Sequence, residues 1–261
     1  MSRLSSVFSA CRAESRAALI GYLPAGYPTV EGSKDVLRTM VSSGCDLVEV
    51  GLPFSDPVMD GPTIQRAAEQ ALRGGFRVRD LFGVVESVAA AGGRAVVMTY
   101  WNPVLAYGVD RFARDLAAAG GLGVITPDLV PDEAASWMEA TDAHDLDRIF
   151  LVAPSSTEER IGLTARSSRG FLYATSVMGV TGARDVVSSA APALVKRVRE
   201  HTDMPIGVGL GVRNGAQAAE LAAFADGVIV GSAFVSAVQD DTVAALTEEL
   251  AAGVRQVPSP A

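Results

Sequence analysis

Short apolar runs alternate with longer stretches of helical periodicity along most of the chain. Between the apolar runs, apolar residues recur every three to four positions, as in helices that bury one face. Strands that alternate with helices predict βαβ units and a parallel sheet. The strand-like runs are Ala18–Leu23, Leu47–Leu52, Ala95–Tyr100, Gly123–Thr126, Arg148–Val152, Gly170–Ser176, Met204–Val208 and Asp226–Val230. The helical patterns include Val30–Ser43, Gly108–Ala119, Pro131–His144, Thr157–Ser168, Ala191–Glu200, Gly215–Ala223 and, at the N-terminus, Leu4–Arg12.

Eight strand-like runs in 261 residues fit a (β/α)₈ barrel, whereas an open doubly wound sheet commonly has fewer strands. We therefore predict an α/β TIM barrel with a short N-terminal helix. A flavodoxin-like or Rossmann sheet with extra strands is the alternative. No linker rich in Pro, Ser or charge interrupts the pattern, so residues 1–261 are expected to form one domain. Frayed structure is expected at the last residues, Gln256–Ala261.

Composition excludes several classes of protein. No uncharged apolar run reaches 18 residues, and Arg12, Glu14 and Arg16 precede the first apolar stretch, so we predict a cytoplasmic protein without a membrane span. The net charge of −8 argues against nucleic-acid binding, which requires a basic surface. Cys11 and Cys45 lie far apart without metal-ligand spacing, and we interpret them as small buried hydrophobic residues.

Two carboxylates follow one another closely in Leu47–Pro62, LVEVGLPFSDPVMDGP. Val48, Val50 and Leu52 alternate with Glu49, so in a strand Glu49 faces away from the three apolar side chains. Asp60 lies in the turn-rich loop that follows. A carboxylate inside a barrel is costly unless it has a use, although a structural ion pair with an arginine is the simpler explanation for a single glutamate. With Asp60 nearby, the pattern indicates an acid/base pair.

Catalytic side chains of such barrels lie where the strands end, and several candidates follow those ends. They are Tyr22 after the first strand, Tyr100 and Asn102 after the third, Asp128 after the fourth, and Tyr173 on the sixth. Each tyrosine taken alone is as well explained by barrel filling with a satisfied hydroxyl. Together they could sandwich an aromatic ligand.

Glycines gather at the ends of the last strands. Gly179 and Gly182 follow the sixth strand, Gly207, Gly209 and Gly211 surround the end of the seventh, and Gly231-Ser232 ends the eighth before a helical pattern. Glycine allows backbone N–H groups to approach an anion, and a helix N-terminus adds a favourable dipole. Tight turns would explain one such pair, but two on adjacent strands favour a phosphate site.

The scarcity of other reactive side chains narrows the chemistry. Lys34 and Lys196, the only lysines, fall on predicted outer helices, which leaves a Schiff-base enzyme without a nucleophile. His144 and His201 lie at predicted helix ends, so neither a metal site nor a histidine base is expected at the barrel mouth. The residues therefore indicate cofactor-free proton transfer on a phosphorylated small molecule.

Six segments, in this order along nearly the whole chain, carry a resemblance to a known family. They are VEVGLPFSDPVMDGPTIQ, MTYWNPV, PDLVPDE, SVMGVTGAR, VGLGV and GVIVGSAFV. The sequence resembles the tryptophan synthase alpha subunit. The resemblance implies a (β/α)₈ barrel that cleaves indole-3-glycerol phosphate to indole and glyceraldehyde 3-phosphate without a cofactor or metal, as the partner of a beta subunit in an α₂β₂ tetramer.

The resemblance also assigns roles to residues. Glu49 and Asp60 match the family's catalytic carboxylates, and Tyr173 matches its active-site tyrosine. The indole pocket would include Tyr22, Tyr100, Pro127 and Leu151, and Asp56, Pro57 and Asn102 would meet the beta subunit. Gly182, Gly211, Gly231 and Ser232 match the family's phosphate-binding positions, and Thr181 and Gly209 are also expected to bind the substrate. The loop Val177–Ser189 is expected to close over the substrate.

Three residues depart from the family pattern near the expected rim of the pocket. Pro24 and Tyr27 stand where many relatives have Thr and Asp, and Met178 stands where Thr is common. None of them replaces a carboxylate or a glycine, so the expectation of catalysis stands. The alternatives are a stand-alone lyase that releases free indole and a non-catalytic subunit, and the intact carboxylates argue against the second.

Overall fold

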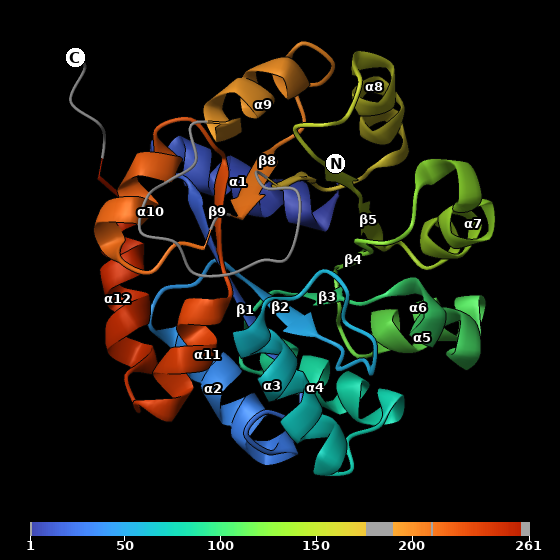
Figure 1. Cartoon of the computed structure of the whole chain (residues 1–261), viewed down its shortest axis with the longest axis vertical. Coiled ribbons are helices and arrows are strands. Elements are labelled where there is room, and N and C mark those ends of the chain that lie inside the picture. Colours follow the sequence, from blue (N-terminus) through green and yellow to red (C-terminus); the bar gives the residue numbers. More distant parts are fainter. Residues whose placement is uncertain (1, 176–189, 210, 257–261) are drawn as a thin grey trace.

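Parallel strands form the centre of the molecule in the computed structural model of the chain (Figure 1). The structure describes residues 2–175, 190–209 and 211–256. Within them the sheet order is β5-β4-β3-β2-β1-β9-β8-β7-β6, and each neighbouring pair is parallel. The strands are β1 Ala18–Pro24, β2 Leu47–Gly51, β3 Ala95–Met98, β4 Gly123–Ile125, β5 Asp147–Ile149, β6 Leu151–Val152, β7 Leu172–Thr175, β8 Ile206–Gly209 and β9 Gly227–Val230.

The predicted run Arg148–Val152 becomes two short strands that share one position in the barrel. Phe150 alone separates β5 from β6, and β5 pairs with β4 while β6 pairs with β7. The two ends of the sheet therefore meet at Phe150, whose carbonyl accepts a hydrogen bond from the Tyr173 N–H at 3.2 Å. The predicted eight-position barrel is confirmed, and the open-sheet alternative is wrong.

Helices surround the sheet on its outer side (Figure 1). Most lie where the periodicity predicts them, and side chains begin several of them: Thr29, Thr157 and Asn214 each accept a hydrogen bond from the first turn of the helix that follows. The helices are α1 Arg3–Ala13, α2 Val30–Ser42, α3 Pro62–Arg73, α4 Val78–Ala90, α5 Trp101–Tyr107, α6 Val109–Ala118, the 3₁₀ turn η1 Pro131–Glu133, α7 Ala135–Ala143, α8 Glu158–Ser167, α9 Ala190–Arg199, α10 Gly215–Ala222, α11 Ser232–Gln239 and α12 Val243–Val254.

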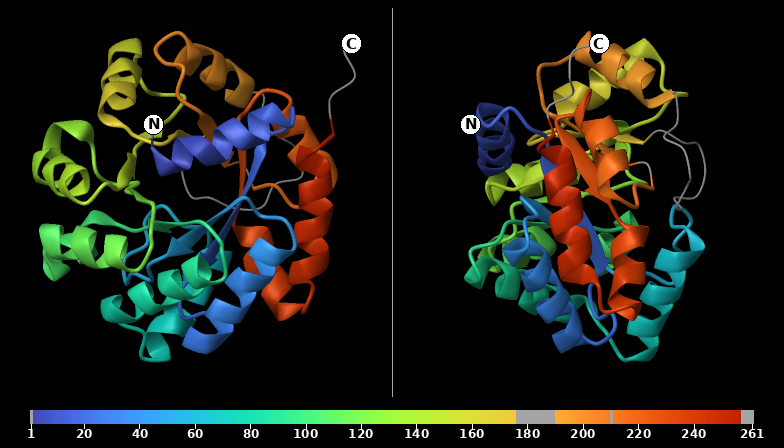
Figure 2. Two further views of the ribbon diagram at one scale, coloured as in Figure 1. Left: turned by 180° about the vertical axis from the view of Figure 1, so that it is seen from behind. Right: turned by 90° about the vertical axis from the view of Figure 1, so that its left-hand side faces the viewer.

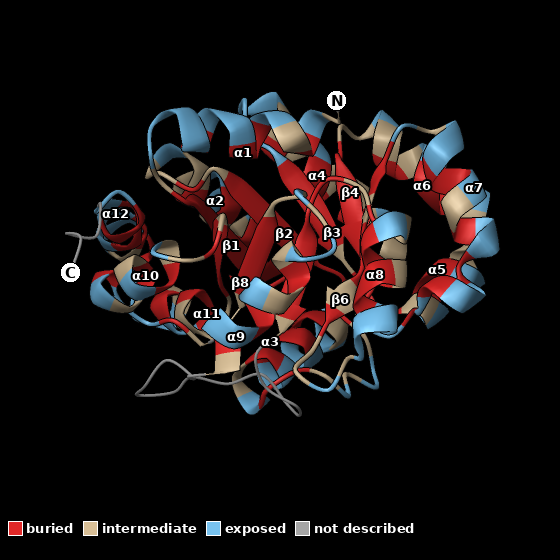
Figure 3. Cartoon of the chain, turned by 90° about the horizontal axis from the view of Figure 1, so that it is seen from above, coloured by how far each residue is buried: buried red, intermediate tan, exposed pale blue. Residues whose placement is uncertain are grey.

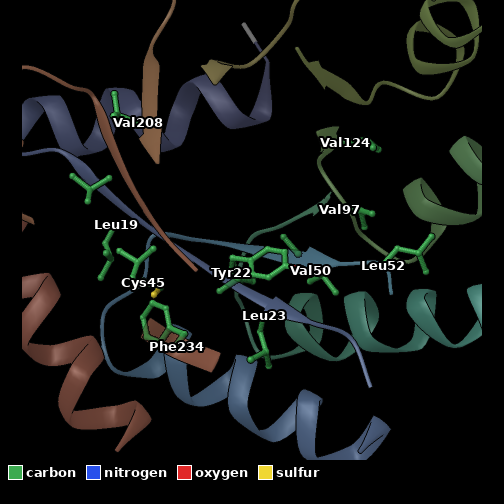
Figure 4. Close-up of a cluster of buried hydrophobic side chains, with 14 of the residues drawn as sticks. Leu19, Tyr22, Leu23, Cys45, Val50, Leu52, Val97, Val124, Val208 and Phe234 are labelled. Atoms are coloured by element: carbon green, nitrogen blue, oxygen red, sulfur yellow. The ribbon is translucent and has the colours of Figure 1, made fainter. Parts of the chain in front are cut away.

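The buried apolar residues form two clusters, one inside the barrel and one between the strands and the helices. Figure 3 shows that the strands are buried while the surrounding helices are buried only in part. Along β2, Leu47 belongs to the inner layer while Val48, Val50 and Leu52 belong to the outer one. Figure 4 shows part of the larger cluster, with the outer-layer residues Leu19, Leu23 and Val50 and also Tyr22. Glu49 alternates with this outer set and is paired in register with Tyr22, so the predicted inward orientation of Glu49 is confirmed.

Helix α1 lies across one end of the barrel (Figure 2). Its Leu4, Phe8 and Cys11 pack with the inner layer, and the rings of Phe8 and Phe171 lie 5.3 Å apart. The buried carboxylate of Asp147, at the start of β5, accepts a hydrogen bond from the Leu4 N–H at 3.4 Å. The N-terminal end of the barrel is thus filled by α1, and a ligand site has to lie at the opposite end.

Candidate functional site

Glu49 is an almost fully buried carboxylate inside the barrel. The residue is 1% exposed, and its Oε1 has no hydrogen-bond partner among the described residues. Burial raises the pKa of Glu49 from the usual 4.5 to about 8, because an ionised carboxylate loses most of its hydration there. Glu49 is therefore protonated at neutral pH and can donate a proton.

Asp60 lies at the end of the loop that joins β2 to α3. The loop holds it through its backbone, since the Asp60 N–H donates to the Pro57 carbonyl at 3.1 Å and the Gln65 amide donates to the Asp60 carbonyl at 2.9 Å. The residue is 8% exposed. Burial raises the pKa of Asp60 to about 6, and a hydrogen bond from the Tyr100 hydroxyl opposes part of that rise. At pH 7 this carboxylate is mainly ionised and accepts hydrogen bonds.

Three buried tyrosines surround the two carboxylates: Tyr22, Tyr100 and Tyr173. Burial raises the pKa of Tyr22 and of Tyr173 well above the usual range, and the carboxylates of Glu49 and Asp60 raise it further when they are ionised. The hydroxyl groups therefore remain protonated. The fold brings Glu49, Asp60 and the three tyrosines together from β1, β2, β7 and two loops. These are residues that the sequence analysis singles out.

Two glycines make room for these rings. A Cβ atom at Gly51 would collide with the ring and hydroxyl of Tyr22, and one at Gly209 would collide with the hydroxyl of Tyr173. Gly209 is predicted as a phosphate contact, and its neighbour in the structure is the tyrosine hydroxyl. Its lack of a side chain is thus explained by the packing of Tyr173.

The other glycines lie next to one another at the same end of the barrel. Gly209 and Ile229 are in register on β8 and β9, and Gly211 and Gly231 each follow two residues later. Gly211 has a φ of +72°, a conformation that favours glycine. Gly231 begins α11, and a Cβ there would lie 3.5 Å from both Tyr22 and Ile64.

The remaining predicted pocket residues differ in position. Leu151 pairs with Tyr173, so both side chains lie on the same face of the barrel wall. Pro127 is half-buried just after β4. Thr181 and Gly182, Met178 and the predicted closing loop Val177–Ser189 lie outside the described residues.

The residues predicted to meet a partner lie on the surface: Asp56 and Asn102 are exposed, and Pro57 is half-buried. Three exposed apolar side chains follow three successive strands beside them: Val58 after β2 is 72% exposed, Leu105 in α5 is 52% exposed and Val130 after β4 is 46% exposed. These three are the large exposed hydrophobic residues of the described chain, and we call them the apolar triad. The sequence analysis missed them, although each is a large apolar residue in a segment that follows a strand end.

Two of the departures from the family pattern can be placed. Pro24 ends β1, where the missing N–H does not interrupt the pairing of β1 with β2. Tyr27 is buried in the loop beyond it, and its hydroxyl accepts a hydrogen bond from Gln239 at the end of α11. Tyr27 therefore joins the loop to the helical layer.

The described residues hold no cluster of three or more side chains from His, Cys, Asp and Glu that could bind a metal ion. None of the helices among them is both long and apolar enough to span a membrane. Cys11 and Cys45 are buried free thiols, as predicted.

Comparison with known proteins gives one consistent family. Residues 8–257 match the family model described as tryptophan synthase alpha chain. The chain is 72% identical over 256 residues to the tryptophan synthase alpha chain of Nocardia farcinica, covering 97% of this chain and 96% of that one. It is 67% identical to that of Mycobacterium avium over 258 residues, covering 98% and 95% of the two chains.

Solved structures agree with the barrel. A chain of tryptophan synthase from Mycobacterium tuberculosis superposes with a TM-score of 0.95 at 66% identity, over 98% of this chain and 99% of that one. A tryptophan synthase alpha chain from Legionella pneumophila, only 30% identical, still gives a TM-score of 0.89 over the full length of both chains.

Proposed function

Because the chain belongs to the tryptophan synthase alpha chain family and is a lyase of tryptophan biosynthesis, we propose that it cleaves indole-3-glycerol phosphate with Glu49 and Asp60. The observation that carries this proposal is the pair of carboxylates at one end of the barrel with pKa values on either side of neutrality. Two carboxylates in different surroundings can serve as the acid and the base of one reaction.

The cleavage requires three events that these groups can perform. Protonated Glu49 donates its proton to C3 of the indole, which makes the indole a leaving group. The bond from C3 to the glycerol phosphate side chain then breaks, while the side-chain hydroxyl becomes the aldehyde of glyceraldehyde 3-phosphate. Its proton returns to Glu49, so the enzyme is regenerated. Ionised Asp60 accepts a hydrogen bond from the indole N–H, where positive charge develops.

The tyrosines and the glycines would bind different parts of the substrate. Tyr22, Tyr100 and Tyr173, with Pro127 and Leu151, offer aromatic and apolar surfaces for a planar indole ring. The phosphate would lie against Gly211, Gly231 and Ser232, where the first N–H groups of α11 have no acceptor within the helix. Thr181 and Gly182 complete the proposed set. Binding by backbone N–H groups is compatible with a net charge of −8.

The pH dependence of kcat/KM tests the two roles. Activity requires Asp60 ionised and Glu49 protonated, so it should fall below about pH 6 and again above about pH 8. Indole release measured from pH 5 to pH 9, with the phosphate's own titration subtracted, should give a bell with a maximum near pH 7. A profile that rises steadily to pH 9 would exclude Glu49 as the acid.

We further propose that a beta subunit binds the apolar triad, together with Asp56, Pro57 and Asn102, in an α₂β₂ tetramer. Large apolar side chains that stay exposed are candidates for contact with a partner when they lie on neighbouring segments. They lie on segments that follow β2, β3 and β4, so a bound partner would cover the same end of the barrel as the carboxylates. This location favours a subunit that delivers indole to a partner over a stand-alone lyase.

Replacing Leu105 with aspartate should weaken binding of the beta subunit at least about tenfold, because a charge would be buried in the interface. The affinity would be measured by calorimetric titration with the beta subunit. Indole release by the isolated chain should stay within about twofold of the original. Ala216→Asp on α10, also exposed but away from the apolar triad, is the matched control (Figure 1). Equal affinities of the two variants would place the interface elsewhere.

A further inference from the structure

We propose that Asp128 is a positioning residue that acts on Asp60 through Tyr100. This inference rests on the proposed role of Asp60. Asp128 lies in the segment after β4 and Asp60 in the loop after β2, and the residue between them belongs to the segment after β3. Three successive segments at the mouth of the barrel would thus be joined in one chain of hydrogen bonds.

The first link joins Tyr100 to the loop that carries Asp60. The Tyr100 hydroxyl accepts a hydrogen bond from the Met59 N–H at 2.9 Å and donates one to the Asp60 carboxylate. Its ring lies against Phe54 of the same loop, with 5.3 Å between the ring centres. One phenol therefore fixes both the backbone before Asp60 and the carboxylate itself.

The second link joins Tyr100 to Asp128. Tyr100 is the N-cap residue of α5, and because a phenol cannot reach back to the first N–H groups of its own helix, α5 has no side-chain cap at this position. The carboxylate of Asp128 replaces that cap: the N–H of Trp101 donates to both of its oxygens, at 2.9 and 3.1 Å. A charged acceptor at a helix N-terminus is favourable, so Asp128 fixes the first residue of α5.

The backbone of Tyr100 is also held on its other side. The Thr99 hydroxyl donates to the Tyr100 carbonyl at 2.9 Å, and the Thr99 N–H donates to Ile125 of β4 at 3.1 Å. With Asp128 in place, the backbone on both sides of Tyr100 is bonded to the β4 segment. Without Asp128 only one side would be, and the phenol would be held less firmly against Asp60.

Asp128 could influence Asp60 in two ways, and removing Asp128 would change the pKa of Asp60 in opposite directions in the two cases. A hydrogen bond to the ionised form of Asp60 lowers its pKa, so loosening Tyr100 raises that pKa and moves the acidic limb of kcat/KM to higher pH. Direct repulsion between two carboxylates acts in reverse, and removing Asp128 would then move the limb to lower pH. The other titratable groups that face Asp60 and are unchanged by the substitution are Glu49, Tyr22 and Tyr173.

The test is a double-mutant cycle on the full chain, with Asp128→Ala, Tyr100→Phe and the double variant. Indole release would be measured from pH 5 to pH 9. We expect each single variant to move the acidic limb upward by about half to one pH unit and to lower kcat more than it changes KM. The shift of the acidic limb in the double variant should be no larger than the shift in Tyr100→Phe alone. Asp128→Asn, which keeps one acceptor oxygen, should shift the acidic limb less than Asp128→Ala does.

Asp132→Ala provides the control, because Asp132 follows the same strand but pairs with Arg160 of α8. Its acidic limb should match that of the original protein. The inference is overturned if Asp128→Ala leaves the limb in place, moves it to lower pH, or adds its full shift to that of Tyr100→Phe. Failure of the proposed function has a different signature: the original protein itself would then lack an acidic limb, or Glu49→Gln would retain its turnover.

Discussion

Replacing Glu49 with glutamine is expected to lower kcat for indole release by about 10²- to 10⁴-fold, the usual contribution of a general acid. Glutamine has nearly the same shape and keeps a carbonyl oxygen, but it cannot deliver a proton to the indole. The substrate KM should change little, because the proposed phosphate contacts come from Gly211, Gly231 and Ser232. Single-turnover and steady-state assays on purified protein would separate the two effects.

The matched control for this substitution is Glu86→Gln, which makes the same chemical change on the exposed face of α4. Its kcat should equal that of the original chain. If Glu49→Gln kept a third of the original turnover, proton donation by Glu49 would be wrong, and the acid would have to be sought among the tyrosines.

The same substitution should stabilise the folded protein, increasingly so as the pH rises. Below pH 4, Glu49 is protonated in both the folded and the unfolded chain, and its titration contributes nothing to stability. Above its ordinary pKa of 4.5 the unfolded chain ionises, while the folded chain keeps the proton up to about pH 8. Unfolding therefore becomes easier in this range, and glutamine removes the effect.

The free energy of unfolding of Glu49→Gln minus that of the original chain should be about 3 kcal/mol larger at pH 7 than at pH 4. Urea denaturation at both pH values measures this difference of differences. Asp60 titrates in both proteins, so its contribution cancels. For Glu86→Gln the difference from the original chain should be the same at both pH values. If the free energy of unfolding of Glu49→Gln changed with pH as that of the original chain does, Glu49 would not be desolvated in the folded state.

Much of the barrel and part of the site follow from local patterns. Alternation along Leu47–Leu52 is enough to place Glu49 inside and Val48 and Val50 outside, because side chains of a strand point alternately to its two faces. Residues at strand ends in a parallel barrel share one mouth, so Asp60, Tyr100 and Tyr173 could be grouped before any coordinates were known. The roles of these residues remain predictions.

Other features depend on contacts between distant parts of the chain. Helix α5 was not predicted, because Trp101–Tyr107 contains a proline and no side-chain cap of its own, and its first N–H is satisfied by Asp128, 27 residues away. The break at Phe150 is visible only once the two ends of the sheet meet. Exposure of Val58, Leu105 and Val130 is likewise a property of the assembled surface, since apolar residues in a sequence are expected to be buried.

The position of α1 decides the direction in which a product can travel. With Leu4, Phe8 and Cys11 packed into the inner layer, the N-terminal end of the barrel is closed, and indole formed at the proposed site beside Glu49 could not leave through that end. It has to depart through the mouth by which the substrate entered, past the segments that bear the apolar triad. A partner bound there would therefore be the first protein to meet the released indole. The direction of release would be determined by α1, a helix at the opposite end of the barrel.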